Sequence, residues 1–442
     1  MHPTTYAEWW RPSPPAGAVV LETAPAEGGE RAAGRFAFGA LVAFTIVLVA
    51  APQEYIHALA PLRLAMIAAV LALVGHLANV MRAGDRIARR TPLPVKLAGA
   101  LLAWTVLTIP LSSWPGGSVS TLSDVFIKSL IIFWLLGRVV STVARLQTLA
   151  TVLSLLSILL AITGIRNYLS GVFAYGRVVG YSSALAGNPN DLALMLNILL
   201  PLSIALVIAG RSPWLRLLAA AAAGLSVMAI IVTFSRGGFL ALSIILVLSL
   251  FWLVRLGKTA LVAGAIVSVL VLAPFTPAGY LERLQTVSDV DSDPTGSAQE
   301  RWRDMQASVA FIQAHPIVGA GLGMDVLALN ELRGRQWKSV HDVYLQYGVD
   351  LGLPGLLLFL ALVCASISAA WRVERETRRT GGDRRLLTLA GAIRISLVAF
   401  AVAAIFYPVA YHFYFYYLAG LASAARTLGT SVGPNSIGTL RS

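Results

Sequence analysis

The feature that most constrains the fold is a series of long apolar segments, separated by shorter stretches that carry charge. A helix needs roughly 20 apolar residues to cross the hydrocarbon core of a bilayer, and only helices and closed β-barrels satisfy their backbone hydrogen bonds in lipid. Barrel strands alternate apolar and polar residues, whereas runs such as 240–253 and 356–362 do not. The sequence therefore predicts an all-α polytopic membrane protein.

We predict about twelve transmembrane helices, each within the usual length range. Charged residues make up 12% of the chain, against about 25% in soluble proteins, which suits a chain with that many spans. The predicted spans are 36–51, 62–81, 95–111, 121–137, 146–165, 191–209, 214–234, 238–254, 259–275, 352–371, 386–407 and 409–425.

The spans and loops divide the chain into five parts. Residues 1–35 contain Pro, Gly, Ala and Glu without an apolar core, so we expect a flexible cytoplasmic tail and no signal peptide. Residues 36–275 hold the first nine spans, and 276–351 form one large external loop with short helices. Residues 352–428 hold the last three spans, and 429–442 form a second cytoplasmic tail.

The orientation of the bundle follows from its basic residues. They cluster after the second, fourth, sixth, eighth and tenth spans, for example at Arg138, Arg211, Arg255 and Arg378. Cytoplasmic loops carry an excess of Lys and Arg, so all five loops fall on one side if both tails are cytoplasmic. We therefore expect the loop 276–351 on the periplasmic or extracellular side.

The net charge of +13 could suggest a nucleic-acid partner. However, the basic residues are scattered between the spans and do not form one soluble surface, so membrane topology explains them better. The expected partner is the lipid bilayer, with no nucleic acid. Cys364 is the one cysteine, so an intramolecular disulfide is excluded.

His341 begins a helical segment at the end of the only long polar insert and leads directly into an apolar span. An imidazole at this boundary can take a proton from a substrate near neutral pH. The alternative is a polar residue that simply ends a span. Tyr344 follows on the same helical face, where it could orient the His341 ring or an acceptor sugar, or only pack.

Arg236 lies in the segment Thr233–Gly238, on the outer side, where the positive-inside rule predicts few basic residues. A guanidinium group at a span end can also reach water without any function. Two glycines follow Arg236, and glycine lets the backbone approach a ligand closely. Because a guanidinium group also matches diphosphate oxygens bidentately, we interpret Arg236 as an anion-binding residue.

Two other motifs have simpler explanations. The acidic run from Asp289 to Asp293 with Glu300 is similar to a calcium loop, but Pro294 stands where the sharp turn needs glycine. The spaced glycines of 319–323 lack the βαβ unit of a nucleotide site, so we expect them to bend the loop back to the membrane. No other His, Cys, Asp and Glu cluster has metal-ligand spacing, so we predict no metal and no cofactor.

Four motifs follow one another along the chain in an order that is specific in combination. An outward loop with Arg177 precedes the turn Asn188–Asp191, a Ser-Arg-Gly element contains Arg236, an Arg-rich helix leads to a His-Pro turn, and the segment from His341 to Gly355 closes the insert. Together they resemble the O-antigen ligase and polymerase superfamily, whose members are integral membrane glycosyltransferases. The family usually has His-Asn at the start of the last motif, where this chain has Asp342 in place of the Asn. Further on the family has Glu-Leu-Gly, where this chain has Asp350 in place of the Glu. The turn Asn188–Asp191 is equally explained as a helix cap.

The resemblance implies a function and a set of site residues. The donor would be a glycan linked to undecaprenyl diphosphate, and the acceptor a saccharide or glycolipid. His341 would act as general base, Arg177 and Arg236 would hold the diphosphate, and Arg301 and Arg303 would add to the anion-binding field. The chain would lie in the bacterial inner membrane with its site on the periplasmic side, with other polysaccharide assembly proteins as further partners.

Two other classes of protein remain open from the sequence. A transporter or flippase for a lipid-linked precursor would carry polar residues within the bundle and often an internal repeat. We find no repeat in the sequence, and the candidate residues lie at the outer boundary of the spans. A membrane scaffold would need none of the outward arginines. Ligase and polymerase differ in the acceptor and are not separated by these motifs.

Overall fold

The computed structural model describes residues 32–83, 91–174, 177–178, 180, 187–272, 297–334 and 337–431. Most of the predicted tails and the acidic run at 289–293 lie outside these residues. The helices are α1 (Ala32–Ala50), α2 (Leu64–Ala83), α3 (Leu93–Thr108), α4 (Pro115–Thr121), α5 (Ile127–Val139), α6 (Val143–Leu169), α7 (Pro189–Ala209), α8 (Pro213–Val232), α9 (Arg236–Arg255), α10 (Thr259–Leu272), α12 (Ser297–Ala314), α13 (Asp325–Ala328), α14 (Val343–Thr380), α15 (Arg384–Ala403) and α16 (Phe413–Ser431).

Short elements join these helices. The 3-10 helices are η1 (Pro52–Glu54), η2 (His57–Leu62), η3 (Ile109–Leu111) and η6 (Ala404–Phe406), and η4 (Leu122–Phe126) is a π-helix. Among the described residues, the strands are β1 (Phe173–Ala174) and β2 (Arg177–Val178), which pair antiparallel. The all-α polytopic class predicted from the sequence is therefore confirmed.

Over the described residues, each predicted span overlaps a helix. Over the described part of the chain, nine helical segments are long and apolar enough to cross a membrane. The predicted spans at α1, α10 and α16 do not meet the same criteria there. The apolar part of α1 is shorter (Gly34–Ala50), and α10 is described only to Leu272.

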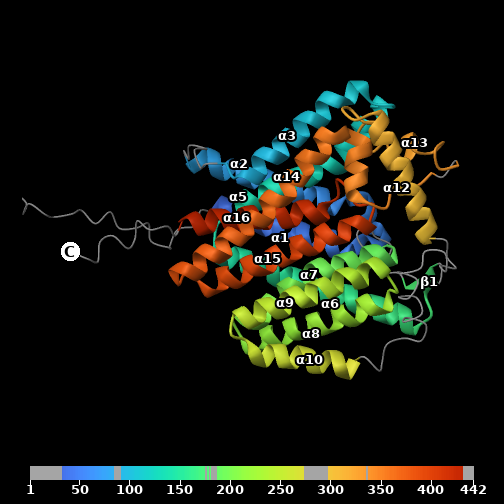
Figure 1. Ribbon diagram of the computed structural model, residues 1–442. Helices are drawn as coiled ribbons and strands as arrows, with labels where there is room; N and C mark the ends of the chain where they lie inside the picture. Colours follow the sequence, from blue (N-terminus) through green and yellow to red (C-terminus); the bar gives the residue numbers. More distant parts are fainter. Residues whose placement is uncertain are drawn as a thin grey trace, which may run out of the picture.

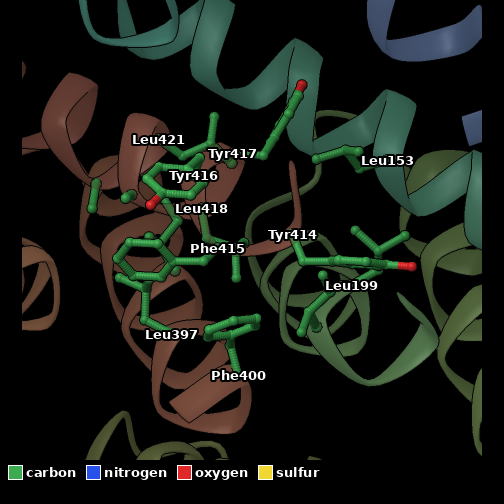
Figure 2. Packing of buried hydrophobic residues seen from close by; sticks show 14 of the residues in the cluster. Leu153, Leu199, Leu397, Phe400, Tyr414, Phe415, Tyr416, Tyr417, Leu418 and Leu421 are labelled. Atoms are coloured by element: carbon green, nitrogen blue, oxygen red, sulfur yellow. The ribbon is translucent and has the colours of Figure 1, made fainter. Parts of the chain in front are cut away.

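The helix α16 differs from the others because protein surrounds it. Figure 2 shows its aromatic residues against Leu153 of α6, Leu199 of α7 and Phe400 of α15. The rings of Phe400 and Phe415 lie 5.5 Å apart. Buried tyrosines need a hydrogen-bond partner, and the hydroxyl of Tyr416 has one 2.7 Å away on α14. Because α16 faces protein more than lipid, it tolerates this polar content.

The two ends of the bundle differ. Figure 1 shows α12, α13 and β1 together on the right, whereas the last turns of α16, in red, lie on the left. We call the first the loop end. The opposite end, which we call the basic end, has basic residues in the last turns of helices such as α5 and α9. This separation gives the molecule one end that carries the described part of the long polar insert.

A break in α14 at Gly352 (φ 67°, ψ −174°) anchors that loop. The amide of Leu353 donates to Pro316 O instead of continuing the helix, which leaves Val349 O free. Asp350 O is also free, because Pro354, one turn later, has no amide hydrogen to donate. These two carbonyls accept the amides of Ala320 (2.7 Å) and Gly321 (2.8 Å).

The three spaced glycines make this docking possible. Gly319, Gly321 and Gly323 all have positive φ (74°, 104° and 72°), which favours glycine. A Cβ on Gly319 would lie 2.6 Å from Val349 O. As expected from the sequence, these glycines bend the loop back onto the bundle.

Candidate functional site

His341 lies at the loop end, immediately before α14. Asp342 caps this helix, because its side chain accepts the amides of Tyr344 (2.8 Å) and Leu345 (3.0 Å). Asn and Asp are about equally good in this position, so Asp342 can serve where the resembling family has Asn. The cap fixes the start of α14 and therefore the direction of the preceding His341.

The His341 ring faces a carboxylate of α12. Its Nδ1 lies 3.5 Å from Asp304 Oδ2, and the side chain is 28% exposed. Within the described residues Nδ1 makes no hydrogen bond of good geometry. The contact therefore becomes an ion pair only when the imidazole is protonated.

Asp304 is held in place by a second charged group. Its side chain is buried, and its Oδ1 accepts a hydrogen bond from Arg333 Nη1 at 2.9 Å. Arg333 Nη2 also donates to Lys338 O at 2.6 Å. Burial raises the pKa of Asp304, but the close contact with His341 and the hydrogen bond and charge of Arg333 outweigh it, so this pKa lies below its ordinary value. Asp304 is therefore an ionised, fixed partner for His341.

The first turn of α7 brings a second carboxylate near His341. Asn188 Oδ1 accepts the amides of Asn190 and Asp191, both at 2.9 Å, so this turn caps the helix. The same turn holds Asp191 close enough to His341 for their charges to interact. The turn Asn188–Asp191 therefore both caps α7 and places Asp191 near His341.

Arg236 is the first residue of α9, beside that turn. Ser235 caps α9 by accepting the amide of Gly238 at 3.1 Å, and its hydroxyl donates to Asn190 Oδ1 at 2.8 Å. This hydrogen bond joins the N-termini of α7 and α9. Phe234 has φ 52°, a conformation that costs a non-glycine residue about 1–3 kcal/mol and tends to occur at functional sites.

The two glycines after Arg236 do not have the role we expected. A Cβ on Gly237 would lie 2.8 Å from Phe406 Cβ, and one on Gly238 would lie 2.6 Å from Ala193 Cβ. Protein atoms of η6 and α7 fill the space that a ligand would need. These glycines therefore let α9 pack closely against its neighbours, and the expectation of a ligand at their backbone is wrong.

Phe406 also connects Arg301 to this region. The Arg301 guanidinium carbon lies 5.9 Å from the centre of the Phe406 ring. The Phe406 side chain also packs against Gly237, the residue after Arg236. Asp304 follows Arg301 by one helical turn on α12, so both face the bundle. Arg303 is exposed, and the structure leaves it outside this group.

The remaining predicted residues are Arg177 and Tyr344. Arg177 pairs with Ala174 in the β1–β2 ladder, at the loop end (Figure 1), and its side chain lies outside the described part. The Tyr344 hydroxyl donates to Ala401 O at 2.6 Å. This bond ties α14 to the end of α15, which favours the packing role for Tyr344.

Asp304, Arg333 and the proximity of Asp191 were not predicted as site features. The sequence contained one usable signal for Asp304. Trp302, Met305 and Val309 recur at three- and four-residue steps on one apolar face of α12, where they are exposed and available to a membrane. The opposite, polar face must then meet polar groups of the protein. Over the described residues, no three His, Cys, Asp or Glu side chains are arranged to hold a metal ion.

The fold and these side chains define a polytopic helical membrane protein with a charged site at one end of its bundle. Residues 219–360 match the family model described as O-antigen ligase. This match confirms the resemblance to the O-antigen ligase and polymerase superfamily and supports a membrane enzyme of that type. The matched segment contains Arg236, Arg301 and His341, whereas Arg177 and Asp191 precede it. No curated protein matches the sequence significantly.

Proposed function

We propose that this protein transfers a glycan from undecaprenyl diphosphate to a hydroxyl group of an acceptor sugar, in the assembly of a cell-surface polysaccharide. The observation that carries the proposal is the pairing of His341 with the buried carboxylate of Asp304, 3.5 Å away. This pair lies beside the joined N-termini of α7 and α9, where Arg236 begins its helix.

His341 is the general base of this reaction. Nε2 takes the proton of the acceptor hydroxyl, while Nδ1 remains directed at Asp304. The negative charge of Asp304 stabilises the imidazolium that forms, as a carboxylate does for the histidine of a hydrolase triad. The acceptor oxygen then attacks the anomeric carbon as the bond from that carbon to the diphosphate oxygen breaks. A single displacement of this kind inverts the configuration at the anomeric carbon.

Arg236, Arg177 and Arg301 bind the diphosphate that leaves. Guanidinium groups match phosphate oxygens bidentately, and preorganised cations at the leaving group stabilise its developing charge. The N-terminus of α9 adds the positive end of a helix dipole at Arg236. Arg301 is supported by its position over Phe406, and Arg177 by its place in the β1–β2 pair at the same end of the bundle.

The proposed location is the inner membrane of a bacterium, with the loop end in the periplasm. It rests on the basic residues at the opposite end and on the positive-inside rule. A ligase and a polymerase share this chemistry and differ in the acceptor, which is a glycolipid core or a second carrier-linked saccharide. Contacts with other polysaccharide assembly proteins are part of the same proposal.

The test is glycosyl transfer by the purified protein in detergent, with a carrier-linked glycan donor and without an ion gradient. We expect the release of undecaprenyl diphosphate to depend on the acceptor. His341→Ala removes the general base, which typically lowers rates about 10²–10⁴-fold, and should leave the melting temperature close to that of the wild type. A protein that only carries the donor across a vesicle membrane, without covalent transfer, would instead be a flippase.

A further inference from the structure

The basic end contains a cavity of about 520 Å³. Its walls come from the start of α3, the last turns of α5 and the last turns of α16. These elements lie toward the end of the bundle opposite to α12 and α13 (Figure 1). The cavity is therefore separate from the site around His341.

Two guanidinium groups give this cavity a preference for anions. Arg138 of α5 and Arg426 of α16 both line it. Glu376 already forms an ion pair with Arg426, so Arg138 supplies the principal positive charge. The start of α3 also lines the cavity at Thr91 and Pro92, and a helix N-terminus favours negative charge.

A buried hydroxyl group points to a ligand in the same place. Ser423 lines the cavity and is 1% exposed, yet its Oγ makes no hydrogen bond to any described residue. A buried hydroxyl without a partner is unfavourable. A ligand oxygen that accepts a hydrogen bond from Ser423 would remove this cost, and a phosphate oxygen held by Arg138 is suited to do so.

The remaining walls identify the source of the phosphate. Trp134 and Val95 present apolar surface to the cavity, which a free inorganic anion would leave unused. We propose that the cavity binds the phosphodiester headgroup of an anionic phospholipid from the adjacent leaflet. Its first apolar carbons lie against Trp134 and Val95. Basic pockets between transmembrane helices are known to hold such headgroups.

The experiment measures phospholipid retention by the full-length protein in a mild neutral detergent, using native mass spectrometry. Added phosphatidylglycerol should remain bound, and phosphatidylcholine should not. Arg138→Gln should lower the retained phosphatidylglycerol about tenfold or more, as expected for the loss of a charged hydrogen-bond donor. Arg372→Gln is the matched control, because Arg372 is exposed on α14 outside the cavity, and it should bind like the wild type.

A second variant keeps the test valid if Arg138→Gln fails to fold. A Cβ on Gly137 would lie 3.5 Å from Ser423 Cβ, so Gly137→Leu fills the cavity and leaves both arginines in place. It should also lose phosphatidylglycerol. Equal retention by the wild type and either variant would overturn the site. Phosphatidylcholine bound as well as phosphatidylglycerol would overturn the preference for an anion, and inorganic phosphate that raises the melting temperature equally would overturn the lipid source.

Discussion

At the scale of single residues, Asp304 determines what His341 can do. The tautomer and the orientation of a histidine ring depend on the groups that contact its two nitrogens. The buried carboxylate 3.5 Å from Nδ1 directs that nitrogen away from the substrate. It also supplies negative charge at the moment when the ring becomes positive. Asp304 is therefore a positioning residue for the proposed base.

The variant Asp304→Asn tests this role. It keeps the shape of the side chain but removes the charge, and we expect transfer activity to fall by between about 10 and 10⁴-fold. It also leaves the buried Arg333 without its charged partner, which costs about 3 kcal/mol of folding free energy. The measurements are the turnover rate and the melting temperature.

A second variant separates catalysis from stability. In the double variant Asp304→Asn with Arg333→Gln, both buried charges are gone, so the melting temperature should return toward the wild-type value. The activity should not return. If activity and melting temperature recovered together, Asp304 would have only a structural role.

The sequence could not predict the Asp304–His341 pair, for a physical reason. Hydropathy and helical periodicity are local, whereas this pair joins α12 to the start of α14 through the folded loop. The function of Gly237 was misjudged for a related reason. A glycine indicates that space is short at its Cβ, but only the fold reveals that Phe406 occupies that space.

At the scale of the elements, α12 presents two different faces. Arg301 and Asp304 face the bundle, and Trp302 and Arg303 are exposed. Neighbouring arginines on one helix therefore have different surroundings. This contrast provides an internal comparison that needs no second protein.

We expect Arg301→Lys to lower transfer and Arg303→Lys to leave it close to the wild-type rate. A diphosphate clamp needs the planar guanidinium fork, whereas a surface arginine needs only a long cationic side chain. The measurement is the initial rate of transfer at equal protein expression. An equal loss in both variants would mean that α12 contributes only general positive charge.

The start of α14 allows a prediction about pH. Burial raises the pKa of Asp342 above its ordinary value, so the native state disfavours its ionised form. Stability from this residue is therefore lost as the pH rises from about 4 through the raised pKa. The variant Asp342→Asn keeps the cap and cannot ionise.

As the pH rises from about 4 to 7.5, the melting temperature of Asp342→Asn should therefore fall less than that of the wild type. Asp342→Ala also removes the cap and should be about 1 kcal/mol less stable than Asp342→Asn at both ends of this pH range. If Asn and Ala behaved alike, the hydrogen bonds of Asp342 to the first amides of α14 would have no energetic role.

At the scale of the whole molecule, the bundle has a loop end with the proposed catalytic site and a basic end with the proposed lipid-binding cavity. Hydropathy predicted the positions of the spans well, because burial in lipid requires long apolar segments. It was least informative for α16, whose tyrosines are buried among other helices. The outward direction of the loop end follows from charge alone and needs its own test.

Cysteine labelling in intact cells provides that test. In a Cys364→Ala background, Arg303→Cys at the loop end should react with an impermeant thiol reagent once the outer membrane is permeable. Arg372→Cys, toward the basic end, should react only after the inner membrane is opened. Both residues are exposed, so access to the compartment decides the result, and the reverse pattern would invert the proposed orientation.

The break at Gly352 has a consequence for how this protein can be recombined. The carbonyls freed there bind the loop, and the amide of Leu353 binds Pro316 O. The first turns of α14 therefore belong to the loop as much as to the span that follows. A chimera made with a related enzyme should have its junction after Leu353, so that the exchanged segment carries both halves of this attachment. A junction at Val343, where the helix begins, would separate His341 from the backbone that supports it.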